Sequence, residues 1–406
     1  MIENIDKKIK AYALKNAISH KGKANSGAVL SALFNEGLEK SEVKEVMLKI
    51  NKVVEEISRF SLAKQEKEFE KLKDLVSERE IREGLPELPN VPKSGVIMRF
   101  RPAPSGPMHV GHVISNLVSS LYVEKYGGKF YIIFDDTDPE AVLKDAYEKI
   151  VEDSNWIFGN VAEFLISSNR MKIYYEYAKK LIEKNSAYVC FCSQEEFKKN
   201  AGIKKSCECR KKSVEENLNS WKKMLDKKGY KPGECVLRFK TPEKYGGINN
   251  PNPAMRDFPL ARINESSHPI QKNKYRVWPL MNLVVSVDDM ELGMTHIIRG
   301  KDHKDNAERQ KMIFEIFGKK YPWTFFIGRI KFKDLVLSKR KIVEKINSGE
   351  YSGWDDLKLP TVSSLRKRGY TRKAFSLFLE NRGLTESDKL ISSKDFFQII
   401  DNFNKQ

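Results

Sequence analysis

The sequence has no apolar run of about eighteen residues, the length that a membrane-spanning helix needs, and no apolar N-terminal segment typical of a secretory signal. It also has no internal repeat and no low-complexity tract. These absences argue against a membrane-spanning, secreted or repeat protein. Hydrophobic residues still make up 40% of the 406 residues, which is enough to form a core. We therefore expect a soluble, cytoplasmic protein with no membrane partner.

Acidic residues are in deficit. The chain has 55 of them against 73 lysines and arginines, which gives a formal net charge of +18. Cationic side chains bind polyanions partly by releasing the counterions that phosphates hold. This balance therefore favours a nucleic-acid partner. A lysine-rich proteome would produce the same excess, so the charge by itself leaves both explanations open.

Cysteine is scarce, and four of the five cysteines fall in two close pairs, Cys190 with Cys192 and Cys207 with Cys209. Short spacings of this kind in a protein without a secretory signal indicate a metal site more than disulfides. Four thiolates would suit tetrahedral Zn²⁺, although each pair is closer than the commoner Cys-x₂-Cys. Free reduced thiols are the alternative. The fifth cysteine, Cys235, has apolar neighbours and is predicted to be a core residue.

The most informative stretch reads as strand, turn, helix and strand in succession. Residues 96–100 form an apolar run typical of a buried strand. Three prolines and a glycine then exclude helix and sheet over residues 101–108. A helix-periodic segment follows and ends at Gly127-Gly128, and residues 130–134 form a second strand. This order predicts a βαβ unit with polar residues at the carboxyl ends of its strands, where open α/β sheets bind ligands.

The turn of this unit carries chemistry. The run His-Val-Gly-His at residues 109–112 stands at the start of the predicted helix. Free N–H groups and the helix dipole favour phosphate there, and the glycine lets a ligand approach the backbone closely. A capping turn with incidental histidines is the alternative. The pattern that extends from Arg99 to His112, and continues in Asp135-Asp136-Thr137, disfavours that alternative.

Two motifs carry a resemblance to a known family. Residues 109–112 resemble the HIGH motif, and the run Leu-Ser-Lys-Arg-Lys at residues 337–341 resembles the KMSKS loop, of the class I aminoacyl-tRNA synthetases. The chain most closely resembles archaeal-type glutamyl-tRNA synthetases of the glutamyl/glutaminyl subclass, over nearly all of its length. The resemblance implies an α/β fold: a Rossmann-like parallel-sheet catalytic core, an inserted acceptor-binding domain, an N-terminal helical domain and a C-terminal helical region.

The resemblance also implies the site residues and cofactors. ATP and Mg²⁺ are implied, with a structural Zn²⁺ at the four paired cysteines. The catalytic residues are His109, His112 and Lys339, which contact the phosphates of ATP and the leaving pyrophosphate. The residues that bind ATP are Pro104, Ser105, Gly106, His109, Gly111, His112, Leu337, Ser338 and Lys339. Those that bind glutamate are Arg99 and Arg299, for its carboxylates, and Asp135, for its α-ammonium. A structural ion pair at a strand end is the alternative for Arg299.

Four positions depart from the family pattern, and one of them is Val336, which stands where the KMSKS loop has its first lysine. Ile133 stands where the family usually has an arginine, Met281 where a tyrosine commonly lines the pocket, and Ala103 where a serine or glutamate is usual. Loss of a tyrosine hydroxyl removes one hydrogen bond, worth about 0.5–1.5 kcal/mol. We expect these changes to alter the affinity for glutamate, and they leave open an altered enzyme.

The predicted organisation has five segments. Residues 266–328 are expected to contain buried strand elements at 283–287 and 295–299. The segments are an N-terminal helical domain (1–92), the first half of the catalytic domain (93–185), an acceptor-stem-binding insertion with the cysteine pairs (186–265), the second half of the catalytic domain (266–328), and the KMSKS-like loop with a stem-contact helical region (329–406).

We expect a glutamate–tRNA ligase, which forms glutamyl-adenylate from L-glutamate and ATP and transfers the glutamyl group to the 3′ end of tRNA. The alternatives are a glutamyl transferase acting on a nontypical acceptor and a non-catalytic tRNA-binding protein on a synthetase scaffold. No strand pattern for the anticodon-reading β-barrels follows, so we expect contacts with the acceptor arm, or a separate anticodon-binding chain. The basic residues available in the insertion include Lys204, Lys205, Arg210, Lys211 and Lys212.

Overall fold

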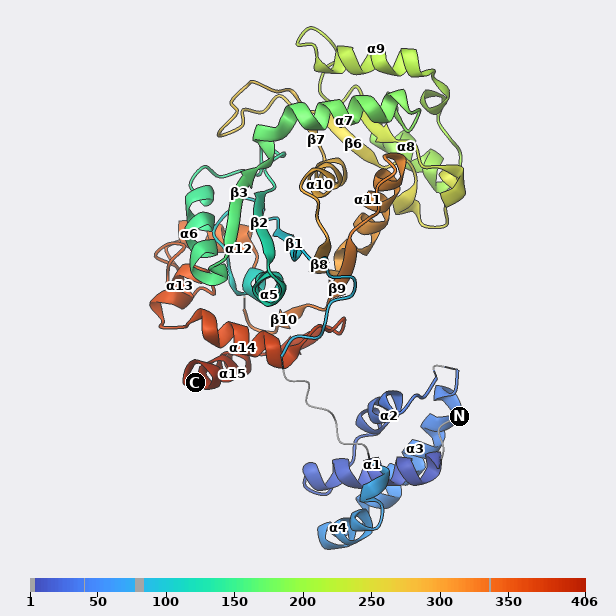
Figure 1. Ribbon diagram of the computed structural model, residues 1–406, viewed down its shortest axis with the longest axis vertical. Helices are drawn as coiled ribbons and strands as arrows, with labels where there is room; N and C mark the ends of the chain where they lie inside the picture. Colours follow the sequence, from blue (N-terminus) through green and yellow to red (C-terminus); the bar gives the residue numbers. More distant parts are fainter. Residues whose placement is uncertain (1–3, 40, 77–83, 336) are drawn as a thin grey trace. The chain divides into compact units, whose positions relative to one another are not determined.

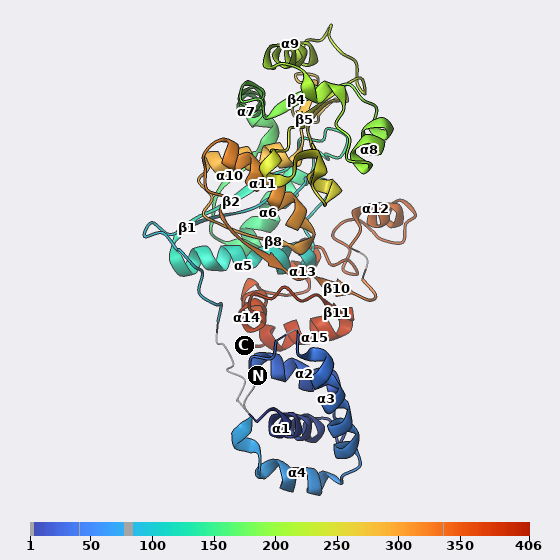
Figure 2. The same cartoon turned by 90° about the vertical axis from the view of Figure 1, so that its right-hand side faces the viewer.

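The computed structural model describes residues 4–39, 41–76, 84–335 and 337–406, without the side chains of residues 339 and 340 (Figures 1 and 2). The chain divides into two compact units, Met1–Ile81 and Arg82–Gln406. The division falls before the predicted boundary at residue 92. The reason is that the proline-rich segment packs on the second unit, where Tyr122 donates to Pro86 O at 2.9 Å and Leu88 N donates to the hydroxyl of Tyr126 at 2.9 Å.

The first unit is helical, as the periodicity predicts. Its apolar side chains, among them Ile9, Leu14, Leu33 and Ile50, form a core of their own. A polar turn separates the first two helices, and Asn25 there caps the second helix by accepting from Ala28 N at 3.1 Å. The helices are α1 (Ile5–Ser19), α2 (Ser26–Asn35), α3 (Val43–Ser58) and α4 (Leu62–Glu70), followed by a 3₁₀ turn, η1 (Lys73–Leu75).

The predicted βαβ unit is confirmed and opens the second unit. Strands β1 (Val96–Phe100) and β2 (Gly128–Phe134) are parallel neighbours, and helix α5 (Val110–Tyr126) connects them. Strand β3 (Val161–Ile166) follows helix α6 (Ala146–Phe158) and extends the sheet in the order β1-β2-β3. Because all three strands run in one direction, Arg101 and Asp135, which follow β1 and β2, lie at the same edge of the sheet.

The second half of the predicted catalytic domain adds two parallel strands beside β1. Strand β8 (His296–Gly300) pairs in parallel with β9 (Trp323–Ile327). Thr295 connects β8 to β1, since Thr295 N donates to Ile97 O at 3.0 Å and Ile97 N donates to Thr295 Oγ1 at 2.9 Å. Helix α5 contacts β1, β2 and β8 (Figure 1). The carboxyl end of β8, with Arg299, therefore opens near those of β1 and β2.

One predicted element is wrong. Residues 283–287 were expected to form a buried strand, but they lie in helix α10 (Met281–Glu291). The side chains from Asn282 to Asp289 are all buried. The helix therefore has no exposed polar face here, and the sequence lacks the polar residues at helical spacing that would have indicated a helix. Helix α11 (Lys304–Ile316) packs against α10. The strand predicted at 295–299 is confirmed as β8.

The insertion forms a four-stranded antiparallel sheet in the order β4-β5-β6-β7. Its core includes Phe239, Trp278 and Cys235, the last as predicted. The sheet extends past residue 265, because β7 pairs with β6. Helix α7 (Met171–Glu183) leads from the region of β3 into this domain (Figure 1). The other elements are β4 (Ala187–Cys190), α8 (Gln194–Gly202), α9 (Val214–Leu225), β5 (Val236–Phe239), β6 (Pro259–Ile263) and β7 (Val277–Pro279).

The C-terminal region packs beneath the histidine turn. Val110 N donates to Pro360 O at 2.8 Å, and Val362 N donates to Met108 O at 3.0 Å, so the two segments hold each other. Helix α14 contacts α5. The elements here are β10 (Ile330–Phe332), α12 (Lys339–Asn347), α13 (Val362–Lys367), α14 (Arg372–Arg382), β11 (Lys389–Ile391) and α15 (Ser393–Asn404).

A buried carboxylate under this turn generates a pH prediction. Asp153 on α6 is 2% exposed, and its Oδ2 accepts from Met108 N at 3.2 Å. Burial raises the pKa of Asp153 to about 7. An unfolded aspartate has a pKa of about 3.9, so between these values the folded state holds a proton that the unfolded state has lost. The contribution of Asp153 to stability is therefore largest below about pH 4 and falls as the pH rises through 7.

We expect Asp153→Asn to raise the free energy of unfolding at pH 8 by about 1–3 kcal/mol, because an amide can accept the same hydrogen bond without a buried charge. At pH 4 the two proteins should be equally stable. Urea unfolding at both pH values measures the difference. Glu148→Gln, at an exposed position on the same helix, is the matched control and should change neither value by more than about 0.5 kcal/mol. Equal effects at pH 4 and pH 8 would contradict the prediction.

Candidate active site

A cavity of about 500 Å³ lies at the carboxyl ends of β1, β2 and β8. Of the predicted site residues, it is lined by Arg99, His109, Gly111, His112, Asp135, Arg299 and Leu337. Four other predicted residues, Pro104, Ser105, Gly106 and Ser338, are described but do not line it. Lys339 is the first residue of α12, and its side chain lies outside the part of the chain that the structure describes.

The two histidines are held by the start of helix α5. Gly111 N donates to His109 Nδ1 at 3.1 Å, and His109 N donates to His112 Nδ1 at 3.2 Å, so the two side chains form a reciprocal cap. Their rings are stacked, with centroids 3.9 Å apart. Because each Nδ1 accepts a backbone N–H, we assign the proton of each neutral ring to Nε2. The histidines therefore cap the helix, as the alternative proposed, and also line the cavity.

Gly111 joins the two predicted motifs. A Cβ atom at this position would lie 3.0 Å from His109 Nδ1 and 3.5 Å from Leu337 Cδ1. A larger residue would therefore push against the imidazole that caps the helix. The closeness of Leu337 also shows that the KMSKS-like segment reaches the histidine turn, although more than two hundred residues separate them in the sequence.

Two arginines of the cavity are neutralised by consecutive aspartates of α10. Arg99 forms a two-pronged ion pair with Asp289, in which Arg99 Nη2 donates to Oδ2 at 2.7 Å. Arg101 Nη1 donates to Asp288 Oδ2 at 2.7 Å, and Arg170 Nε donates to Asp288 Oδ1 at 2.8 Å. The side chains of both aspartates are fully buried. Arg99, predicted as a ligand of glutamate, thus lines the cavity while already paired.

Arg299 differs from the other two arginines. It donates from Nη1 to the amide oxygen of Gln310 at 2.8 Å. Within the described residues, no carboxylate oxygen lies within 4.0 Å of it, so the alternative of a structural ion pair is not what the structure contains. Burial lowers the pKa of Arg299, and the nearby positive charge of Arg99 lowers it further. Asp289, which is already paired with Arg99, and Tyr321 act in the opposite direction, but neither gives Arg299 a carboxylate of its own.

Asp135 is a carboxylate of the cavity that stays partly open to solvent. Its Oδ1 lies 3.9 Å from Arg101 Nη2, and its backbone N donates to Pro102 O at 2.9 Å. The next residue, Asp136, anchors the turn: its carboxylate accepts from Tyr147 Oη at 2.7 Å and from Ser168 N at 2.8 Å. Burial raises the pKa of Asp136. The anchor fixes the direction in which Asp135 leaves strand β2.

Of the four departures from the family pattern, Val336 lies outside the described residues, and the other three fall in different surroundings. Ala103 and Met281 line the cavity. Ile133 does not line it: its side chain is fully buried in a small apolar cluster with Tyr131 and Met294. An arginine at residue 133 would have to enter that cluster. The change to isoleucine is therefore matched by the packing around it.

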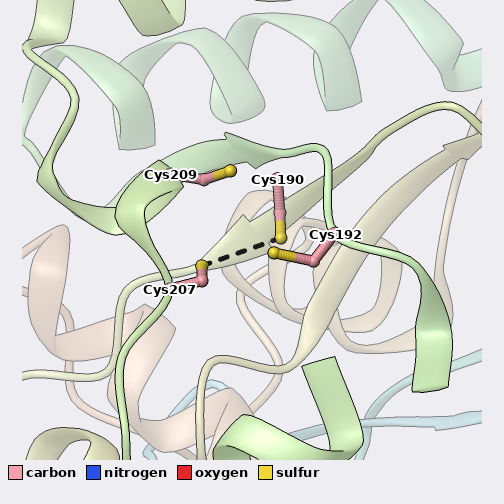
Figure 3. Close-up of side chains that lie close together, drawn as sticks. All are labelled: Cys190, Cys192, Cys207 and Cys209. Atoms are coloured by element: carbon pink, nitrogen blue, oxygen red, sulfur yellow. Dashed lines mark hydrogen bonds between the residues drawn. The ribbon is translucent and has the colours of Figure 1, made fainter. Parts of the chain in front are cut away.

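The four paired cysteines come together between β4 and the 3₁₀ turn η3 (Glu208–Lys211) (Figure 3). Their sulfur atoms all lie within 4.8 Å of one another, and those of Cys190 and Cys207 are 3.9 Å apart. Tetrahedral ligands at about 2.3 Å from Zn²⁺ would be separated by about 3.8 Å. The hydrogen bond with Cys190 lowers the pKa of Cys207 to about 5. The donor set and its spacing fit a zinc ion.

Several polar residues of the site were missed from the sequence: Arg101, Asp288, Asp289, Gln310 and Tyr321. The signal that could have found the aspartates is an acidic pair directly after an apolar run, because buried carboxylates need cations. Because that run was assigned to a strand, the pairing of the two aspartates with the arginines was not predicted. Arg210, expected on a tRNA-facing surface, instead points inward, where its Nε donates to the buried Asp257 at 2.8 Å.

Comparison with known proteins identifies the family. The family model of the class I tRNA synthetases (E and Q), catalytic domain, matches residues 95–403. The chain belongs to this family. It is 43% identical to the glutamate–tRNA ligase of Methanocaldococcus jannaschii over 97% of its own length and 70% of that relative's. It is 41% identical to the enzyme of the same name from Pyrococcus furiosus, over 96% of this chain and 68% of the relative.

Solved structures support the fold. The structure of a glutamate tRNA ligase from Elizabethkingia meningosepticum covers 75% of this synthetase and matches it with a TM-score of 0.51 at 21% identity, over 68% of that chain. The glutamate-tRNA synthetase of Elizabethkingia anophelis gives the same score over 69% of its length. The predicted α/β fold class is therefore confirmed. Within the described residues, no helix is long and apolar enough to cross a membrane.

Proposed function

We propose that this synthetase ligates glutamate to tRNA, using ATP and Mg²⁺ as class I tRNA synthetases generally do. The observation that carries the choice of amino acid is Arg299, a cation of the cavity that is held by an amide and not by a carboxylate. The names of the relatives agree with this choice. A protein that only binds tRNA would have no use for a buried arginine that lacks an anionic partner, because such a charge is costly to desolvate.

The charges of the cavity favour a substrate with one net negative charge. Arg99 is balanced by Asp289. Arg101 and Arg170 are balanced by Asp288 together with Asp135. Arg329 pairs with Asp302, and burial lowers the pKa of His303 and so favours its neutral form. Arg299 is left as the excess positive charge. Glutamate carries two carboxylates and one ammonium group, so its net charge complements the site.

The roles of the residues follow from these contacts. Arg299 would bind the γ-carboxylate as a two-pronged partner, and Asp135 would receive the α-ammonium. Arg99 is already paired with Asp289, and it would bind a carboxylate of glutamate only through the part of its guanidinium that lines the cavity. His109 and His112 would donate from Nε2 to the phosphates of ATP as negative charge shifts during attack of the α-carboxylate on the α-phosphate. The remaining assigned ATP contacts are Pro104, Ser105, Gly106, Gly111, Leu337, Ser338 and Lys339.

The cysteine cluster would hold a structural zinc ion through Cys190, Cys192, Cys207 and Cys209. Neighbouring groups already point at the sulfur atoms: Phe191 N donates to Cys209 Sγ at 3.4 Å, and the Tyr188 hydroxyl lies 3.8 Å from Cys207 Sγ. The ion would connect β4 to η3 and so stiffen the insertion that we assign to the acceptor arm. The exposed lysines Lys204, Lys205 and Lys211 remain available for phosphate contacts.

A first test concerns the phosphate site. We expect His112→Asn to lower the rate of glutamyl-adenylate formation about 10²–10³-fold, as for loss of one transition-state donor. The asparagine oxygen can still accept from His109 N, so the helix cap is kept. His112→Gln, whose amide nitrogen can reach the Nε2 position, should recover part of the rate. Single-turnover kinetics measure both, and an unchanged rate in His112→Asn would remove His112 from the mechanism.

A second test concerns the amino acid. Arg299→Met should lower kcat/KM for glutamate about 10²–10³-fold, because its carboxylate would lose both charge and hydrogen bonds. The weak use of glutamine should change little. ATP–pyrophosphate exchange in the presence of tRNA measures both substrates. Arg329→Gln is the matched control, since this arginine lines the same cavity but pairs with Asp302. Parallel losses for glutamate and glutamine in Arg299→Met would show a structural role.

A third test concerns the metal. The purified protein should contain about one zinc per chain, and Cys207→Ser should abolish it, because structural sites of this kind need all four ligands. Cys235→Ser, in the core of the same domain, should keep the metal. Chelation should increase hydrogen exchange in residues 187–212 more than in β1 and β2. Elemental analysis that finds no zinc in the parent protein would exclude the site.

A further inference from the structure

A fully buried glutamine, Gln310 on helix α11, holds the guanidinium of Arg299. The amide oxygen of Gln310 accepts from Arg299 Nη1 at 2.8 Å and from the hydroxyl of Tyr321 at 3.1 Å. Its amide nitrogen donates to Asn282 Oδ1 at 3.3 Å. Both ends of the side chain are therefore engaged, and its orientation is fixed by three neighbours that come from different elements.

We propose that Gln310 is a specificity-determining positioning residue: it fixes Arg299 for the γ-carboxylate of glutamate while leaving its positive charge uncompensated. The contrast with the other arginines carries this inference. Arg99 and Arg101 line the same cavity, and each is bound by a buried carboxylate. Arg299, on the neighbouring strand, receives an amide in the equivalent role. A neutral acceptor can orient a guanidinium without consuming its charge.

A carboxylate at residue 310 would reverse the electrostatics with little change in shape. Glutamate and glutamine side chains have nearly the same size, and Asn282 could turn its amide to donate to the new carboxylate. Arg299 would then have a buried ionic partner, and a substrate carboxylate would have to compete with it. The site would become neutral overall. It would then suit the side-chain amide of glutamine at least as well as the carboxylate of glutamate.

The surroundings of Arg299 support this reading. Its pKa is lowered first by burial and then by the charge of Arg99. An anion that enters the cavity would therefore stabilise the charged form of Arg299. Because Gln310 is neutral, this stabilisation is still available to the carboxylate of the substrate. The hydroxyl of Tyr321 lies beside Arg299 and Gln310, at a position that the sequence pattern did not indicate. Met281, which stands where the family commonly has a tyrosine, lines the cavity without a hydroxyl.

The experiment compares four variants in ATP–pyrophosphate exchange with tRNA present, using glutamate and glutamine as substrates. Gln310→Glu should lower kcat/KM for glutamate about 10²-fold and leave that for glutamine within about threefold, so that discrimination collapses. Gln310→Met, which removes the positioning but adds no charge, should lower kcat/KM for glutamate about tenfold through KM. Glu308→Gln, exposed on the same helix, should change neither value. The KM for ATP should stay constant in all three.

The fourth variant, Arg299→Met, separates this inference from the proposed function on which it rests. If Arg299→Met removes discrimination but Gln310→Glu keeps it, Gln310 has no role in specificity and only this inference fails. If Arg299→Met lowers kcat/KM equally for glutamate and glutamine, the assignment of Arg299 itself fails. Equal losses for both substrates in Gln310→Glu would make Gln310 merely structural. Should Gln310→Glu not fold, Tyr321→Phe replaces it, and an effect on glutamine as large as that on glutamate would overturn the proposal.

Discussion

Two arginines at the end of β1 are bound by two consecutive aspartates of helix α10, and the geometry of the cavity depends on this double pairing. The partners are far apart in the sequence, separated by 190 residues for Arg99 with Asp289 and by 187 for Arg101 with Asp288. Removing one partner of such a buried pair costs about 3–5 kcal/mol, because the other charge is left uncompensated. The pairs thus fasten the first half of the catalytic domain to the second at the cavity.

The pairing also decides which cation of the cavity is left without a carboxylate partner among the described residues. With Arg99 and Arg101 satisfied, the excess charge of the cavity falls on Arg299, which Gln310 orients without neutralising it. The start of α5 lines the same cavity with two histidines whose Nδ1 atoms accept backbone N–H groups, so that the neutral rings carry their protons on Nε2. The cavity therefore combines a guanidinium suited to a carboxylate with imidazole N–H groups suited to phosphates, which is what the proposed joining of an amino acid to ATP requires.

The sequence was a good guide to local structure and to the motifs. Residues 96–134 gave strand, turn, helix and strand because proline, glycine and apolar periodicity act over a few residues. The grouping of the four cysteines was predicted correctly for a similar reason. The two members of each pair are close in the sequence, so the fold only had to bring the two pairs together. By contrast, the apolar run at residues 283–287 was assigned to a strand. Burial on all sides removes the periodic signal that separates a helix from a strand, and the error concealed Asp288 and Asp289 as partners of the arginines.

The sequence by itself therefore determined the fold class, the βαβ unit, the histidine turn, and three charged residues that line the cavity, Arg99, Asp135 and Arg299. Only the tertiary structure decided how those charges are paired. Arg99 and Arg299 look equivalent in the sequence as ligands for glutamate, yet one is neutralised by Asp289 and the other is held by an amide. The reason is that Coulomb interactions and desolvation depend on distances between residues that are remote in the chain. Those distances are set by the packing of α10 against α11 and by the ion pairs that hold α10 to the residues at the end of β1.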